Sequence, residues 1–149
     1  MIFVSLIANV ALLVALETSV AAPAPAPKAE ILGLWKGSST CAKIEGNEFC
    51  HDERIVYNFV DVPDKPATVA LKAARIVDGT VVRAFDLYFD YRPDTGDWAC
   101  EFDRDKSRGL WTYVIAGDGL TGTAMLLPER KIVRNVAAKR TTKDQVLAP

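Results

Sequence analysis

The stretch at residues 81–91, VVRAFDLYFDY, decides the fold class of this 149-residue chain. Phe85, Leu87 and Phe89 alternate along it with polar residues such as Asp86 and Asp90. A period of two places the two sets on opposite faces of an extended segment, which predicts a half-buried β-strand. Asp-Gly at residues 78–79 comes just before it and is typical of a tight hairpin turn, so the preceding segment should pair with this strand.

Similar short runs rich in β-branched and aromatic residues, separated by turn-forming residues, fill the chain from Ile31 to Arg140. One of them, residues 68–77, would also suit a helix, but no run has the length and period of a clear amphipathic helix. The eight predicted strands are residues 34–40, 54–60, 68–77, 81–91, 98–103, 110–115, 120–127 and 132–140.

Eight short strands joined by hairpins predict an all-β, antiparallel up-and-down barrel, with no long helix in the mature domain. Closing the sheet on itself removes the exposed edge strands that an open sheet would leave. A barrel of this size holds packed side chains or one small ligand. A β-sandwich of the same strands is the competing architecture.

The two ends of the chain have a different composition from the barrel segment. Residues 1–21 combine a near-continuous apolar run with small residues before the expected cut after Ala21, a pattern typical of a secretory signal peptide. Residues 22–30 begin with Ala-Pro repeats and are interpreted as an extended spacer. The barrel domain is then expected at residues 31–140 and a flexible tail at 141–149, in a secreted or periplasmic protein.

The charge balance excludes some classes of partner. The chain has 18 basic and 19 acidic residues, scattered along its length. Nucleic-acid binding needs a basic stripe, and electrostatic membrane binding needs a basic face, so neither is expected after signal cleavage. The sequence gives no indication of assembly, and we expect a monomer.

Two of the three cysteines lie in CAKIEGNEFCHDE, residues 41–53. In an oxidising compartment a cysteine pair favours a disulfide, and Gly46-Asn47 between Cys41 and Cys50 is a turn composition. Cys41–Cys50 is therefore the expected bridge, with Cys50–Cys100 as its rival. If the first pair forms, Cys100 is a buried, unreactive thiol.

Residues 50–53, Cys-His-Asp-Glu, are consecutive, so their side chains alternate between faces and do not converge on a metal ion. A serine at 38 or 39 with His51 lacks a nucleophile elbow or an oxyanion loop. Asp-Thr-Gly at residues 94–96 matches the aspartic-protease triplet, but between Pro93 and Asp97 it is interpreted as a hairpin turn. We therefore expect no enzyme activity, no metal site and no cofactor.

Gly33-Leu34-Trp35, at the start of the first strand, resembles the G-x-W motif of lipocalins and other calycins. In that superfamily the tryptophan caps the barrel base and an arginine from the last strand packs on its ring. The resemblance implies Trp35 as the barrel cap and Arg140 or Arg134 as its partner. The chain also resembles uncharacterised exported bacterial proteins that share a W-x-G-x-S-x-C start.

The resemblance implies a non-enzymatic barrel that binds a small apolar or amphipathic molecule, with Tyr57 and Tyr113 as polar handles. A packed core made of the same aromatic residues is the simpler alternative. A second functional reading is a protein-binding inhibitor of the calycin type, for example of a secreted protease, with residues 22–30 as its arm. The candidate ligand-lining residues are Tyr57, Phe59, Phe85, Phe89, Trp111 and Tyr113.

Overall fold

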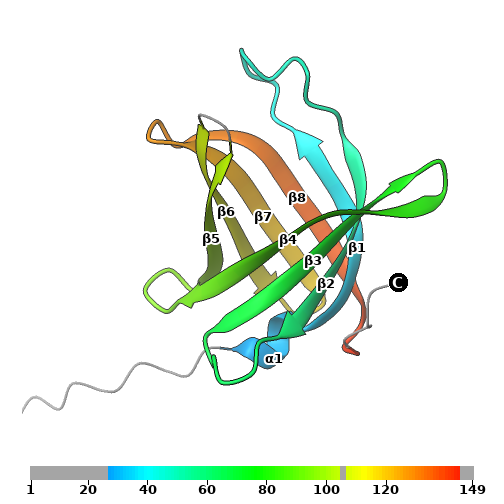
Figure 1. Cartoon of the computed structure of the whole chain (residues 1–149), viewed down its shortest axis with the longest axis vertical. Helices are drawn as coiled ribbons and strands as arrows, with labels where there is room; N and C mark the ends of the chain where they lie inside the picture. The colour runs from blue at the N-terminus through cyan, green and yellow to red at the C-terminus, as the bar shows by residue number, and fades with distance from the viewer. Residues whose placement is uncertain (1–26, 105–106, 145–149) are drawn as a thin grey trace, which may run out of the picture.

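The computed structural model describes residues 27–104 and 107–144, which form a closed eight-stranded antiparallel barrel (Figure 1). Each strand pairs with the next along the chain, and β1 pairs with β8 to close the sheet. This confirms the predicted all-β fold class and the meander order. The elements are α1 (Lys28–Ile31), β1 (Gly33–Cys41), β2 (Glu53–Asp61), β3 (Thr68–Val77), β4 (Thr80–Arg92), β5 (Asp97–Arg104), β6 (Ser107–Ala116), β7 (Gly119–Leu127) and β8 (Lys131–Thr142).

Closure depends on a close approach of β1 and β8. Their register pairs Trp35 with Arg140 at one end and Cys41 with Arg134 at the other. At Gly37 a Cβ atom would lie 2.0 Å from the carbonyl oxygen of Ala137, a distance that no side chain tolerates. Glycine at this position therefore allows the two strands to come together.

The base of the barrel, the end at which α1 lies, is closed by Trp35. This side chain is fully buried, and its indole Nε1 donates to the carbonyl oxygen of Ile31 at 2.8 Å. The guanidinium of Arg140 lies over the ring, 4.2 Å from the centroid, and donates to the Leu32 carbonyl. Arg134, the other arginine considered for this contact, lies at the opposite end of β8.

The interior between the two ends is filled with aromatic side chains. Phe59, Phe89 and Tyr113 are completely buried, and their ring centroids lie 5.0–6.1 Å apart in edge-to-face or tilted contacts. Such geometry is the preferred one for aromatic pairs. Burial alternates with a period of two on β3, and on β2 the alternate residues Ile55, Tyr57 and Phe59 belong to the core cluster.

The structure extends some of the predicted segments. The helix α1 begins at Lys28, inside the expected spacer at residues 22–30, and its Ile31 is fully buried in the core. Strand β8 continues to Thr142, beyond the predicted end at Arg140. The expected signal peptide lies outside the described residues, as does most of the expected tail.

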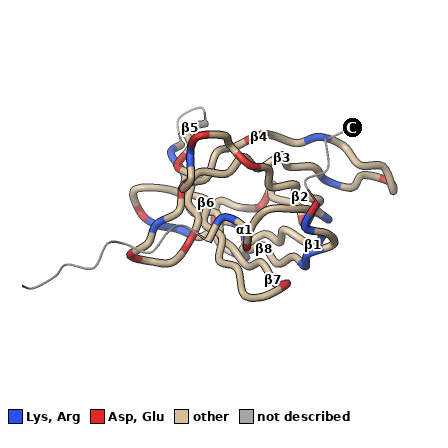
Figure 2. Tube along the Cα trace, turned by 90° about the horizontal axis from the view of Figure 1, so that it is seen from below, with Lys and Arg blue, Asp and Glu red and all other residues tan. Residues whose placement is uncertain are grey.

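Charged residues of both signs are scattered over the chain trace, as seen from the base of the barrel in Figure 2. No basic stripe stands out in this view. Among the residues that the structure describes, no helix is both long and apolar enough to cross a membrane.

Candidate functional site

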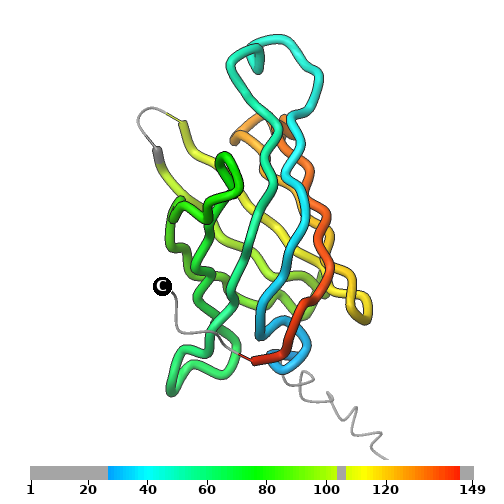
Figure 3. The backbone as a smooth tube through the Cα atoms, turned by 90° about the vertical axis from the view of Figure 1, so that its right-hand side faces the viewer, coloured from blue at the N-terminus to red at the C-terminus, as the bar shows by residue number. Residues whose placement is uncertain are grey.

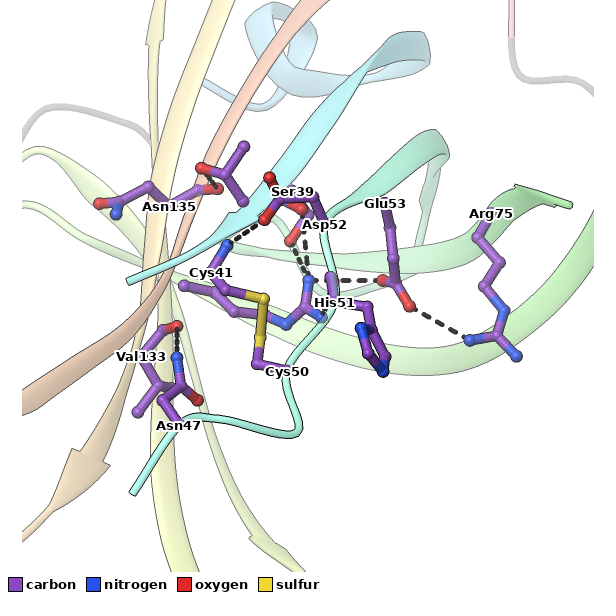
Figure 4. Close-up of polar contacts among 12 residues, drawn as sticks. Ser39, Cys41, Asn47, Cys50, His51, Asp52, Glu53, Arg75, Val133 and Asn135 are labelled. Atoms are coloured by element: carbon purple, nitrogen blue, oxygen red, sulfur yellow. Dashed lines mark hydrogen bonds and ion pairs between the residues drawn. A yellow bond between two sulfur atoms is a disulfide. The ribbon is translucent and has the colours of Figure 1, made fainter. Parts of the chain in front are cut away.

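The end of the barrel opposite α1, called the mouth here, carries a polar network centred on Arg134 of β8. Figure 4 labels its partners Ser39, His51 and Glu53. Its Nη1 donates to Ser39 Oγ at 2.8 Å, and its Nη2 donates to the backbone carbonyl of His51 at 2.7 Å. The carboxylate of Glu53 lies 3.4 Å from the same guanidinium. One arginine therefore connects β8 with β1 and with the start of β2.

Glu53 is shared between two arginines. Its other carboxylate oxygen lies 3.1 Å from Nη1 of Arg75 on β3, whose side chain is half exposed. The backbone N–H of Cys41 donates to the carboxylate of Asp52 on the same side of the mouth, so two carboxylates accompany the two guanidinium groups there. Glu53 thus pairs with arginines of β3 and β8.

Ser39 and His51 do not form a nucleophile and base pair in this network. The Ser39 side chain is buried, and its hydroxyl oxygen accepts from Arg134. His51 contributes its backbone carbonyl, while the residue itself is exposed at the start of β2. Both residues accept hydrogen bonds from Arg134 and so help to hold its side chain in place.

The loop between β1 and β2 is held to the mouth by a disulfide. Cys41 and Cys50 are bonded, with their Cα atoms 5.9 Å apart, so the expected pair is confirmed and the rival pair Cys50–Cys100 is wrong. Asn47 Nδ2 donates to the carbonyl oxygens of Ala42 and Val133, at 2.8 and 3.0 Å. The stapled loop, drawn in cyan to teal, projects beyond the strands in Figure 3.

Cys100 is the remaining thiol. It is free and buried on β5, and burial raises its pKa. A thiol that stays protonated at neutral pH is a poor nucleophile, in agreement with the unreactive cysteine that the sequence predicted.

The second half of the mouth is aromatic. Phe85, Phe102 and Trp111 come from β4, β5 and β6, and the centroids of the Phe85 and Phe102 rings lie 6.2 and 6.5 Å from that of Trp111. Phe85 is 36% exposed, whereas Trp111 is only 8% exposed. Phe102 covers Gly109, where a Cβ atom would lie 2.2 Å from the phenyl ring. Glycine on β6 therefore makes room for this aromatic cluster.

The six candidate ligand-lining residues are divided between the mouth and the core. Phe85 and Trp111 lie at the mouth, where a molecule from solvent would meet them. The remaining four are at most 2% exposed and pack on one another deeper in the barrel. These four are Tyr57, Phe59, Phe89 and Tyr113.

The two phenols expected as polar handles are buried below the polar network. Burial raises the pKa of Tyr57 to about 12, against smaller opposite effects of Tyr113 and of the positive charge on Arg134. Burial also raises the pKa of Tyr113 well above the ordinary value. Both groups are therefore neutral hydroxyls over the physiological pH range.

The Asp94-Thr95-Gly96 triplet forms the turn between β4 and β5. Arg92 Nε donates to the Asp97 carboxylate at 2.8 Å across this turn, and the hydrogen bonds from Arg92 hold the pKa of Asp97 below its usual range. Gly96 has a φ of 71°, which glycine adopts without strain. The triplet therefore forms the hairpin turn that the sequence predicted.

Arg75 and Phe102 were not among the candidates, and Ser39 and Glu53 were considered only as catalytic or metal-ligating groups. The alternation of inward and outward side chains along a strand could have identified Glu53 as a mouth residue. Glu53 continues the inward series of Ile55 and Tyr57 on β2. This alternation does not predict which arginine of another strand reaches Glu53. Among the described residues, no three His, Cys, Asp or Glu side chains are grouped so as to hold a metal ion.

Comparison of the chain with models of known protein families and with curated proteins finds no match. The fold and the geometry of the mouth are therefore the basis for a functional proposal.

Proposed function

We propose that the chain is a secreted, non-enzymatic, lipocalin-like barrel that binds a small apolar or amphipathic molecule at its mouth. The observation that carries this proposal is the division of the mouth into two chemically different halves. Inward-facing groups of β1, β2, β3 and β8 supply a polar half, whereas β4, β5 and β6 supply an aromatic half. A molecule with an apolar body and a polar group matches both halves.

The position of this site follows from how the barrel is filled. Trp35 and Arg140 close the base, and the aromatic core occupies the space above them. Phe85 is the most exposed ring of the cluster, so a molecule would contact it first and lie against Trp111. The ligand would then rest on the core and would not penetrate it.

Export to an oxidising compartment is part of the proposal. The Cys41–Cys50 bridge supports it, because disulfides persist mainly outside the reducing cytosol. The signal peptide expected at residues 1–21 points to the same compartment.

The amphipathic dye 8-anilinonaphthalene-1-sulfonate is a suitable probe, since it combines aromatic rings with an anionic group. We expect it to bind the folded protein, with enhanced dye fluorescence and energy transfer from tryptophan. Phe85→Ser should weaken binding by about tenfold, because it removes the exposed apolar wall. Val114→Ser, at an exposed outward position on β6, is the matched control and should leave binding unchanged. Equal binding by both variants would exclude the mouth as the site.

A protein-binding inhibitor is a second candidate, and a specific observation favours it. Exposed large apolar side chains gather around the mouth, led by Phe49, which is 94% exposed on the stapled loop. Val77, Val81 and Val82 on the β3–β4 hairpin are 38–49% exposed. Large apolar side chains that stay exposed on two loops offer contacts to a protein partner. Inhibition of a secreted metalloprotease that is lost in Phe49→Ser would support this candidate, and unchanged inhibition would exclude the loop.

A further inference from the structure

Strand β4 has one edge that no described strand covers over most of its length. Residues 80–90, apart from Ala84, pair with β3 on one side, whereas only residues 90–92 pair with β5 on the other. The N–H of Tyr88 lies on the sulfur of Cys100, so the free part of the edge ends there. Figure 1 shows β4 continuing from this point into the β3–β4 hairpin, which projects beyond the barrel. Among the described strands, residues 80–87 therefore have a neighbour on one side only.

The backbone groups that face the free edge follow from the register with β3. The N–H of Tyr91 donates to the carbonyl of Ala67, on the β3 side of β4. Successive residues of a strand direct their N–H and C=O groups to opposite edges, so Asp86 directs its groups away from β3. Arg83 does the same, because its partner on β3 is two residues from the partner of Asp86. Both residues therefore offer a donor and an acceptor at the free edge.

A bulge at Ala84 places the side chains of Arg83 and Asp86 on the same face of β4. In a regular strand, residues three apart point to opposite faces. Here the extra residue shifts the alternation by one position. Across the sheet Arg83 and Asp86 lie opposite residues 74 and 72 of β3, which share a face because they are two apart.

Because of this bulge, residues 81–88, VVRAFDLY, are complementary to a second copy of themselves in antiparallel orientation. Antiparallel pairing requires that opposite residues point to the same face, and the shifted alternation meets this condition about the midpoint between residues 84 and 85. The resulting pairs, each formed twice, are Ala84 with Phe85, Arg83 with Asp86, Val82 with Leu87 and Val81 with Tyr88. Every pair is either oppositely charged or apolar on both sides, and cross-strand pairs of both kinds stabilise a sheet.

The charges near the midpoint are already paired within one chain, and a second copy leaves these contacts in place. The carboxylate of Asp86 lies 2.6 Å from Arg83 and 3.6 Å from Lys72. The Arg83 side chain is nevertheless 76% exposed. In the antiparallel pair, two arginines and two aspartates alternate around the midpoint, so each Arg83 lies beside two carboxylates. The second copy therefore adds two ion pairs and removes none.

The apolar side chains of the same segment are exposed in the single chain. Val81 is 49%, Val82 is 38% and Tyr88 is 64% exposed. A hollow of about 390 Å³, lined by Tyr88 and Leu110 among others, leaves room beside the tyrosine ring for the Val81 side chain of a second copy. An unpaired strand edge is a template for pairing with another chain, and here the segment that matches it best is its own.

We propose that the free edge of β4 is a contact between two copies of this chain, which form a symmetric dimer by antiparallel pairing of residues 81–88. Reciprocal N–H···O=C hydrogen bonds join Arg83 of one copy to Asp86 of the other, flanked by the apolar pairs. The contact uses the same surface twice, so the assembly closes at two copies. The dimer replaces the monomer expected from the sequence, and it does not depend on a ligand at the mouth.

Sedimentation velocity over a range of protein concentrations tests for the dimer, and charge reversal tests its register. Arg83→Glu and Asp86→Arg should each weaken self-association by at least about tenfold, because like charges then face each other across the symmetric contact. Lys139→Glu, at an exposed position on β8, is the matched control and should associate like the native chain. Thermal midpoints near that of the native chain show that each variant is folded.

An equimolar mixture of Arg83→Glu and Asp86→Arg separates pairing between copies from pairing within one chain. In the mixed dimer each reversed side chain faces an opposite charge on the other copy, although the contacts within each chain stay repulsive. The mixture should therefore associate to within about threefold of the native affinity. Amide exchange at Arg83 and Asp86, but not at Glu101 on β5, should slow in concentrated native protein relative to dilute protein.

Three results would overturn the proposal. The first is a native chain that stays monomeric up to about 1 mM, where even a weak dimer forms. The second is a dimer that both single variants retain. The third is a mixture of the two variants that associates no better than either variant alone.

Discussion

At the scale of single residues, Trp35 is the side chain whose loss should cost most. It is completely buried, donates to Ile31 and lies under the Arg140 guanidinium. Trp35→Ala should lower the free energy of unfolding by roughly 3–5 kcal/mol, because it leaves a cavity at the base and removes two polar contacts. Urea denaturation followed by circular dichroism measures this loss.

The neighbouring Lys36, exposed on the other face of β1, provides the control. Lys36→Ala should change the stability by less than about 0.5 kcal/mol. A Trp35→Ala protein as stable as the Lys36→Ala protein would show that the base is closed by other groups.

A second residue-scale prediction concerns Tyr57 and alkaline pH. Its pKa is raised to about 12 by burial, whereas the same group in the unfolded chain titrates near 10. Below pH 10 both states keep the proton, and between pH 10 and 12 only the unfolded chain releases it. Stability should therefore fall with rising pH in this window, by roughly 2–3 kcal/mol from this group.

Denaturation midpoints measured from pH 9 to pH 12 test this prediction. Tyr57→Phe should show a smaller slope, with the remainder due to Tyr113 and Cys100, whose pKa values are also raised. Val136→Ala, a buried position without a titratable group, should be less stable at every pH but keep the native slope. Parallel curves for the native chain and Tyr57→Phe would argue against the burial of an ionisable phenol.

At the scale of elements, the β1–β2 loop gains its order from the staple. The bridge between Cys41 and Cys50 closes about ten residues, which by the chain-entropy model stabilises the fold by ~2.7 kcal/mol. Cys41→Ala/Cys50→Ala should lose about this amount in chemical denaturation, and reduction of the native chain should have the same effect. Proteolysis without reduction should yield a linked Cys41–Cys50 peptide and a separate Cys100 peptide. A denaturation midpoint that does not respond to reduction would contradict this account.

The strands are the elements that the sequence predicted best. Their bounds agree with the structure to within two residues at most ends, because alternation such as Phe85, Leu87 and Phe89 and turn pairs such as Asp78-Gly79 act locally. Even residues 68–77, which also suited a helix, form β3, since pairing with both neighbours outweighs propensity. The helix α1 was not predicted, because its four residues are fixed by docking of Ile31 and not by a helical pattern.

At the scale of the whole molecule, local sequence patterns predict fewer of the contacts between strands. The Trp35–Arg140 contact was expected from a family resemblance, and either arginine fitted it until the register of β1 and β8 was known. The network of Ser39, Glu53 and Arg134 joins β8 to β1 and β2, with sequence separations of 95 and 81 residues. The separation of β4 and β5 outside the three pairs from Asp90–Ala99 to Arg92–Asp97 is likewise a property of the closed sheet, because each strand alone has a regular alternating pattern.

That separation predicts an uneven distribution of local stability over the barrel. Strands β2 and β3 are paired along most of their length around the buried Phe59 and Leu71, so their amides should exchange with solvent only on global unfolding. The amides of Asp86 and Glu101 lie outside the three residue pairs that join β4 and β5 and need only a small opening. Native-state hydrogen exchange should therefore be faster at these two positions than at Phe59 by at least about two orders of magnitude.

The comparison has an internal control in the paired part of the same two strands. Asp90 and Ala99 face each other in the ladder and should exchange more slowly than Asp86 and Glu101, although all four lie on the same side of the barrel. Amide protection that falls along each strand from the turn toward the mouth would show that the two strands separate in solution. Uniform protection along both strands would mean that β4 and β5 pair over their full length.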